Sequence, residues 1–236
     1  MVAALAPPPA PAQPEPAAPV SRPSAYSRMT YAEFEAAGED PGTRVEWLGY
    51  TAERRDGEPL GAVQPVWGYN SDGSPAVPTP NHSTIVTNLT LEIGGRVDRD
   101  AWRLDAQGME FVLPTGRWRY PDLMLTPEPV VYEPRADGRP GRVANAAVVI
   151  EILSESTETV DLGEKRADYL SAPSVTDYLV IDQDEPLIWH PARGGTPAAP
   201  EWRIRRIEGV AETITLALPP LKLPLAAVYA RVLPAG

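Results

Sequence analysis

The sequence contains no cysteine, and this absence excludes several chemistries at once. Disulfide bonds, thiolate zinc sites, iron–sulfur clusters and a cysteine nucleophile all need that residue. Histidine is almost as scarce, since His82 and His190 are too few for a multi-histidine metal site in one chain. No segment approaches the roughly 18 consecutive apolar residues that a membrane helix needs. We therefore expect a cytoplasmic protein.

Lysine is the next residue that is nearly missing. Of the 21 basic residues only Lys165 and Lys222 are lysines, and all the others are arginines. In a chain that uses arginine for almost all of its positive charge, a lysine suggests that an amine is needed at that position. The alternative is drift in base composition that left two lysines without a function.

Positive charge as a whole is also in deficit, because 32 acidic residues give a formal net charge of −11. Nucleic-acid binding is driven by neutralisation of phosphates and normally requires a basic face. Three groups of arginines could still line a cleft: Arg96, Arg99 and Arg103; Arg117 and Arg119; and Arg203, Arg205 and Arg206. This balance favours weak or selective binding of nucleic acid.

Proline, in contrast, is abundant, and the 29 prolines argue against a bundle of long helices. Residues 1–28 are especially rich in proline and alanine, which is typical of an extended, solvated segment. We expect this segment to be disordered and to contribute nothing to the core. The remaining residues, 29–236, are expected to form one domain.

Capping signals and apolar spacing predict the helices. Thr30 and Glu33 form a capping box at the start of the first one. Ile85, Leu89 and Ile93 share one face of a second helix, for which Asn81 is the predicted cap. The predicted helices cover residues 30–38, 82–93, 161–171 and 223–233.

The strands are predicted from short apolar or alternating runs between turn residues. They cover residues 44–52, 102–106, 109–114, 119–126, 146–153, 177–182, 186–190, 201–207 and 212–218. Residues 53–80 are expected to form a loop or a poorly packed hairpin, and residues 127–145 a loop. The run 146–153 is nearly all apolar, as expected of a central strand that is covered on both faces. The predicted fold class is therefore α/β, a mixed sheet flanked by helices.

Three charged residues stand out against this pattern. Asp122 follows Pro121 in the strand-like segment YPDLML, Glu151 interrupts the apolar strand AVVIEIL, and Lys165 lies in the first turn of the next helix. A carboxylate in a buried strand is costly unless it is paired or binds a metal. Two carboxylates on neighbouring strands can coordinate Mg²⁺ and leave waters and a substrate phosphate to complete the octahedron. A lysine nearby can orient or deprotonate the attacking water.

The segments YPDLML, VVIEILSESTETVDLGEKRADYL and VTDYLVID together resemble the Uma-two family of bacterial restriction-endonuclease-like proteins, a branch of the PD-(D/E)XK phosphodiesterase superfamily. The resemblance begins near MTYAEFEA at residue 29 and covers all of the chain except the proline-rich segment. It implies a restriction-endonuclease-like core that binds Mg²⁺ or Mn²⁺ at one end of a mixed sheet.

The same resemblance implies roles for individual residues. Asp122 matches the aspartate of the family's PD pair and Glu151 matches its (D/E) position, with the backbone carbonyl of Ile152 as a third metal ligand. The general superfamily pattern has lysine where this chain has Leu153. In the Uma-two family the lysine is displaced into the next helix, and Lys165 matches it.

Two further residues match the family less directly. Glu46 in RVEWLGY matches a glutamate of an early strand that could hold a metal-bound water. His82 in TPNHSTI matches a histidine that could contact a phosphate or a carboxylate.

Each of these residues also has a purely structural interpretation. Asp122 could end a strand, Glu151 could form a structural ion pair, and Lys165 could be an ordinary residue at a helix start. Glu46 could be a charge at a strand edge, and His82 could be a capping or solvated histidine.

The sequence therefore leaves two functions of different class. The first is a Mg²⁺-dependent endonuclease that hydrolyses phosphodiester bonds in DNA, for which a homodimer would supply the two sites that double-strand cleavage needs. The second is a catalytically weak or inactive relative that serves as a binding or assembly module, and metal-dependent cleavage would separate the two. A glycosidase with paired carboxylates is disfavoured because few aromatic residues lie near Glu151.

Overall fold

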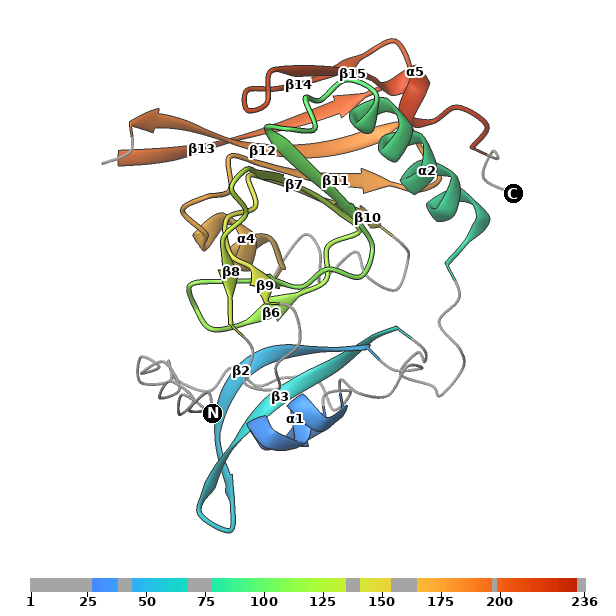
Figure 1. The fold of residues 1–236 in the computed structure, drawn as a ribbon. Coiled ribbons are helices and arrows are strands. Elements are labelled where there is room, and N and C mark those ends of the chain that lie inside the picture. Colours follow the sequence, from blue (N-terminus) through green and yellow to red (C-terminus); the bar gives the residue numbers. More distant parts are fainter. Residues whose placement is uncertain are drawn as a thin grey trace, which may run out of the picture.

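The computed structural model describes residues 27–37, 44–67, 78–134, 141–153, 165–196 and 199–232. A six-stranded sheet forms its centre (Figure 1). The strands in spatial order are β13 (Ala199–Glu208), β12 (Leu187–Thr196), β11 (Asp177–Asp182), β10 (Val148–Leu153), β7 (Leu123–Pro127) and β4 (Trp102–Ala106). β10 and β11 are parallel, and all other neighbours in this sheet are antiparallel. The predicted mixed sheet is confirmed.

β10 is the central strand that its composition predicts. All six of its residues are buried, between β7 on one side and β11 on the other. Because successive side chains of a strand point to opposite faces, Ile150 and Ile152 face one layer of the core while Val149 and Leu153 face the other. Glu151 falls on the same face as Val149 and Leu153.

Helix α2 (Pro80–Gly94) covers the first of these faces, together with the segments at the C-terminal end of the described chain (Figure 1). These segments are β14 (Thr213–Leu216), β15 (Leu221–Pro224) and α5 (Leu225–Val228). The predicted stripe of Ile85, Leu89 and Ile93 is fully buried. The closing segment, predicted as one helix, instead combines the end of a strand with a four-residue helix.

The N-cap of α2 differs from the prediction. Thr79 caps the helix, and its hydroxyl accepts a hydrogen bond from the backbone N–H of His82 at 3.1 Å. Pro80 follows at the first helical position, where its missing N–H costs nothing. Asn81, the predicted cap, lies inside the helix and donates to Asp184 at 2.9 Å.

The second face of the sheet packs against α4 (Arg166–Ser171) and a layer of short strands. These strands are β5 (Phe111–Val112), β6 (Trp118–Arg119), β8 (Tyr132–Glu133) and β9 (Arg142–Val143). β8 and β9 lie in the segment that was predicted to be a loop. The predicted cap of α4, Asp161, lies outside the described residues.

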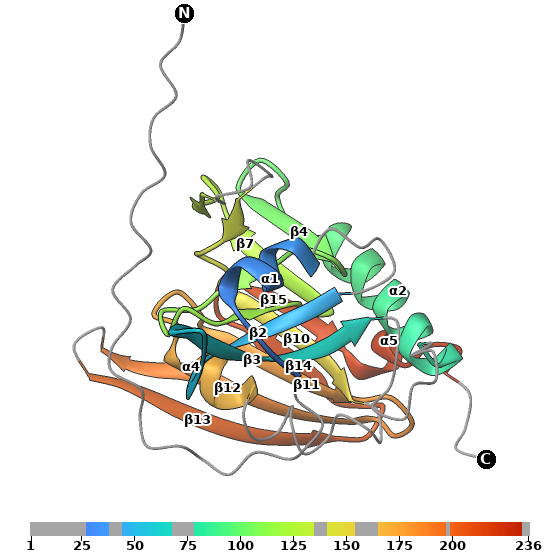
Figure 2. The same ribbon diagram turned by 90° about the horizontal axis from the view of Figure 1, so that it is seen from below.

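Beyond the short strands lies a layer built from the first described residues (Figures 1 and 2). It contains β1 (Ser27–Met29), α1 (Tyr31–Ala37), β2 (Arg44–Arg55) and β3 (Glu58–Trp67). The predicted capping box is present, because the N–H of Thr30 donates to Glu33 at 2.7 Å and the N–H of Glu33 donates to Thr30 at 3.2 Å. The aromatic cluster of Phe34, Trp47 and Trp118 joins this layer to β5 and β6.

β2 and β3 form an extended hairpin, so the first part of residues 53–80, expected to be a loop or a poorly packed hairpin, takes the hairpin alternative. Asp56 and Gly57, at φ of 52° and 87°, occupy the turn. Asp-Gly is the sequence that such a turn favours because both residues need positive φ. Gly61 in β3 is required by packing, since a Cβ there would lie 1.9 Å from the ring of Trp47.

Strand β1 begins two residues before the predicted boundary at Met29. Ser27 and Arg28 belong to β1 and pair with Val63 and Ala62 of β3. The expectation that residues 1–28 take no part in the fold is therefore wrong for these two residues. Residues 1–26 lie outside the described residues, so the division into a tail and one domain stays a prediction. No helix in the described part of the chain is long and apolar enough to cross a membrane.

Candidate active site

The pairing of β7 with β10 brings Asp122 close to the part of β10 that carries Glu151. Leu123 pairs with Ile150 at the end of this antiparallel ladder; Asp122 immediately precedes β7, and Glu151 is the next residue of β10. The backbone N–H of Ile152 donates to Oδ2 of Asp122 at 2.8 Å, which fixes the aspartate against the end of β10. Asp122 and Glu151, which are 29 positions apart in sequence, therefore lie at the same end of the sheet.

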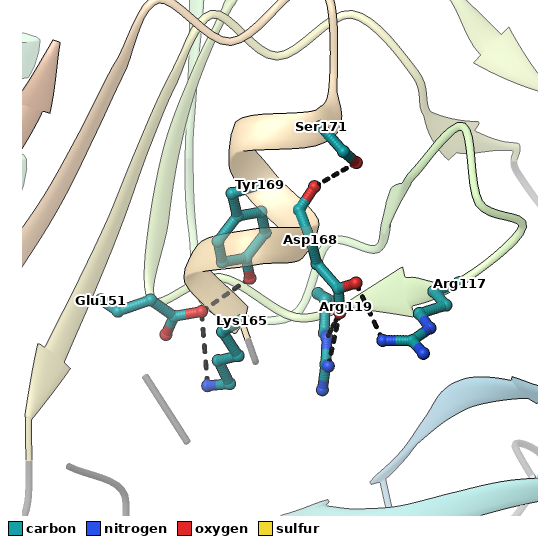
Figure 3. A network of polar contacts seen from close by, with 7 residues as sticks. All are labelled: Arg117, Arg119, Glu151, Lys165, Asp168, Tyr169 and Ser171. Atoms are coloured by element: carbon teal, nitrogen blue, oxygen red, sulfur yellow. Dashed lines mark hydrogen bonds and ion pairs between the residues drawn. The ribbon is translucent and has the colours of Figure 1, made fainter. Parts of the chain in front are cut away.

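Glu151 is buried, with 3% of its surface exposed, and two donors from α4 contact its carboxylate (Figure 3). The Lys165 Nζ atom lies 3.4 Å from Oε1, and the hydroxyl of Tyr169 donates to the same oxygen at 2.6 Å. Residues four apart in a helix lie on the same face, which explains how one short helix supplies both donors. The buried charge of Glu151 is thus compensated as burial requires.

His82 lies beside the second carboxylate. Its Nε2 atom is 3.2 Å from Oδ1 of Asp122, and its position follows from the cap of α2, where Thr79 binds its backbone N–H. Nδ1 of the same ring is buried and has no hydrogen-bond partner among the described residues. The His82 contact is therefore with a carboxylate, one of the two kinds of group that the resemblance implies.

Glu46 is placed only by its backbone. It belongs to β2 and pairs with Gln64 of β3. Its side chain lies outside the described part of the structure, so its role in holding a water stays a prediction. The role of the Ile152 carbonyl as a metal ligand also stays a prediction, although Ile152 itself is described in β10.

Tyr169 is a site residue that was not among those expected from the sequence. The four-residue spacing of Lys165 and Tyr169 in the segment KRADYL indicates that the two share one helix face. The long-range part of the contact, from α4 to β10, has no local signature.

The arginines beside the site have a different role from the one considered in the sequence analysis. Arg119 is fully buried, and it binds Oδ2 of Asp168 through Nε at 3.0 Å and Nη2 at 2.6 Å. Arg117 binds the other oxygen of Asp168 at 2.9 Å (Figure 3). These two arginines anchor α4 to the strand layer and do not form an open basic cleft.

The donor set of the site suits a hard divalent cation. Mg²⁺ prefers oxygen ligands and is commonly held by one or two carboxylates, with waters and substrate oxygens completing its shell. Asp122 and Glu151 provide two carboxylates at one sheet end. The described residues contain no group of three or more His, Asp or Glu that could hold an ion. Among the described residues, a metal at this site would depend on the two carboxylates together with non-protein ligands or backbone oxygen.

A comparison with family models supports this interpretation of the chain. The Uma2 family, described as "Putative restriction endonuclease", matches residues 69–226. The matched segment contains Asp122, Glu151, Lys165 and His82, and it begins after Glu46.

One relative and one solved structure are similar to the chain. A protein of Synechocystis sp. (strain ATCC 27184 / PCC 6803 / Kazusa), named "Uncharacterized protein sll1609", is 30% identical over 109 residues, which are 44% of this chain and 57% of that protein. The chain thus matches little more than half the length of this relative. The crystal structure of a putative nuclease from Anabaena variabilis ATCC 29413 superposes with a TM-score of 0.53 at 14% identity, covering 67% of this chain and 85% of the other.

At this level of identity the superposition shows the fold alone, and that fold is a nuclease-like α/β fold with mixed sheets and a few helices. The family match is broader, since it spans more than half of the chain and includes both Asp122 and Glu151. The chain therefore belongs to the Uma2 family, the family described as putative restriction endonucleases.

Proposed function

We propose that this protein is a Mg²⁺- or Mn²⁺-dependent endonuclease that hydrolyses phosphodiester bonds in DNA. One observation carries the proposal: the carboxylate of Asp122 accepts from the backbone N–H beside Glu151, and the amine of Lys165 lies 3.4 Å from the buried carboxylate of Glu151. Membership of the Uma2 family supports the same reaction class.

In this proposal Asp122 and Glu151 hold the divalent ion. When bound, the ion supplies positive charge that polarises the scissile phosphate and lowers the pKa of a nearby water. The ammonium group of Lys165 orients the attacking water and offsets the negative charge that develops on the phosphate. Attack of the water oxygen on phosphorus forms a new P–O bond and breaks the bond to one ester oxygen. The attacking water loses a proton to solvent, and the leaving oxygen takes up a proton from solvent. His82 contacts Oδ1 of Asp122, while the N–H of Ile152 binds Oδ2, so both oxygens of the aspartate are held in position. Glu46 is proposed to assist with a second water.

The charge distribution favours weak or selective binding of DNA. Of the arginine groups that could contact phosphates, Arg117 and Arg119 are engaged by Asp168, and Arg96 and Arg103 pair with acidic neighbours. On the edge strand β13, Arg206 pairs with Glu208, whereas Arg203 and Arg205 are exposed without an ion pair among the described residues. The net charge of −11 opposes strong non-specific binding.

The test combines metal binding with cleavage. We expect Mg²⁺ or Mn²⁺ to raise the thermal midpoint of the full chain. At a metal concentration of 100 Kd, binding should add about 2.7 kcal/mol to the free energy of unfolding. Plasmid DNA should be nicked or cut under the same conditions. Asp122→Asn and Glu151→Gln should each lose the cleavage and most of the metal-induced rise.

Glu92→Gln is the matched control. Glu92 is also an acidic residue and pairs with Arg96 on α2, away from the candidate site, so its variant should keep both the rise and the cleavage. A metal-induced rise that is unchanged in both site variants would contradict the proposed ion site. Metal binding without cleavage of any nucleic acid would instead favour the second function, an inactive relative that serves as a binding module.

A further inference from the structure

Tyr169 makes the shortest polar contact to the proposed metal ligand Glu151 among the contacts described above. Its hydroxyl lies 2.6 Å from Oε1, and both side chains are buried within the core layer between the sheet and α4 (Figure 3). A buried tyrosine hydroxyl needs a hydrogen-bond partner, and a carboxylate is one of the strongest acceptors.

The ring of Tyr169 is held firmly by its neighbours. It stacks on Phe111 with 6.2 Å between ring centroids and an interplanar angle of 11°. Tyr178 packs against it at 5.1 Å with a tilt of 51°. Because both of these aromatic side chains contact the ring, its hydroxyl is presented at a defined point beside β10.

The two donors on Glu151 contribute different things. Lys165 carries a positive charge and compensates the carboxylate, but its amine sits on a long side chain and its contact is the longer one, at 3.4 Å. Tyr169 is neutral, so it adds direction more than charge. The terminal torsion of a glutamate is broad and roughly two-fold, so a carboxylate without a fixed donor does not present its oxygens in one orientation.

We propose that Tyr169 is a positioning residue, which sets the orientation of the Glu151 carboxylate for the divalent ion through its hydroxyl. This inference rests on the proposed function, because it assumes that Glu151 binds the ion. Hydrogen bonds to a ligating carboxylate orient it, and their loss typically costs about 10- to 100-fold in metal affinity or activity.

Tyr169→Phe tests the proposal because it removes the hydroxyl and keeps the ring. Binding of Mn²⁺ alone to the full chain, measured by titration calorimetry, should weaken about 10- to 100-fold. The circular dichroism spectrum should stay that of the folded protein. Tyr229→Phe is the matched control, since it removes the hydroxyl of another buried tyrosine, which donates to the backbone carbonyl of Asp182 and does not contact Glu151. It should lower the thermal midpoint and leave the Kd for Mn²⁺ unchanged.

The outcomes separate this inference from the proposed function. If the wild-type chain binds no Mn²⁺, the proposed metal site fails and the role of Tyr169 fails with it. If the wild type binds Mn²⁺ and folded Tyr169→Phe binds it equally well, only the positioning role is overturned. An equal loss of affinity in Tyr229→Phe would also overturn it, because a general loss of stability would then explain the effect.

Discussion

At the scale of single residues, one of the two lysines of the chain pairs with a buried carboxylate. Lys165 is one of two lysines, and its side chain is 10% exposed while that of Glu151 is 4% exposed. From the sequence, Lys165 could be a site residue or an ordinary residue at a helix start. Its burial excludes the exposed position that is usual for a lysine at a helix start. A buried ion pair of this kind contributes both to stability and to any chemistry at the site.

Lys165→Met keeps the apolar stem and deletes the charge. Breaking a buried ion pair by removing one partner costs about 3–5 kcal/mol, and the remaining hydrogen bond from Tyr169 should hold the loss near the lower value. Cleavage should fall about 10²- to 10³-fold with loss of a charged donor at the transition state. Urea unfolding and plasmid cleavage measure the two effects.

The same variant should respond more strongly to metal than the wild type. A divalent ion can replace the charge that Lys165 supplies to Glu151, so Mn²⁺ should raise the thermal midpoint of Lys165→Met by more than that of the wild type. Equal cleavage by the two proteins would show that the water is positioned by another group, such as Glu46.

At the scale of elements, α4 is a six-residue helix that would not be stable by itself. One side of it carries the contacts to Glu151, and the other carries Asp168, which binds Arg117 and Arg119 of the strand layer (Figure 3). The helix is therefore held in place by a buried ionic anchor. Its donors can reach β10 only while that anchor keeps the helix in position.

Asp168→Asn tests this anchor. The variant removes the carboxylate charge that binds the fully buried Arg119, so the free energy of unfolding should fall by about 3–5 kcal/mol in urea titrations. Ser171→Ala is the control on the same helix. It removes only a hydroxyl that donates to the backbone carbonyl of Asp168 at 2.6 Å, and its loss should be about 1 kcal/mol. Similar losses in the two variants would show that the ionic anchor contributes little.

At the scale of the whole molecule, Tyr229 joins the last described segment to the sheet end where β11 turns into β12. Its hydroxyl donates to the carbonyl of Asp182 at 2.7 Å and accepts from the N–H of Leu187 at 3.2 Å. Burial raises the pKa of the Tyr229 hydroxyl above its ordinary value of about 10. The folded protein thus keeps this proton to a higher pH than the unfolded chain does.

Tyr229 therefore makes the stability of the protein depend on pH. Below about pH 10 the hydroxyl is protonated in both the folded and the unfolded state, and its contribution to the free energy of unfolding is fully present. As the pH rises further, the unfolded chain ionises first, and this contribution is lost. Tyr229→Phe should cost about 1–2 kcal/mol at pH 7 by removing the hydrogen bonds. The difference between wild type and variant should shrink between pH 10 and pH 11 in urea titrations. A difference that stays constant over this range would contradict the raised pKa.

Local signals in the sequence determined much of this protein. The capping box of Thr30 and Glu33, the buried stripe of α2 and the apolar run of β10 each depend on residues within a few positions of one another, and all three are present in the structure. The Asp56-Gly57 turn is equally local, and its sequence would have predicted the hairpin. Family membership follows from motifs that can be read along the chain.

Tertiary structure alone decided which of the charged residues meet. Strand pairing brought Asp122 to the backbone N–H beside Glu151, and the packing of α4 on the sheet brought Tyr169 to the carboxylate of Glu151. It also buried Arg119 against Asp168, although an arginine in a short strand looks no different in sequence from an exposed one. These contacts join residues 18 to 49 positions apart. The physical reason is that the register of the sheet and the layer packed against it arise from the burial of the whole core, which no local window contains.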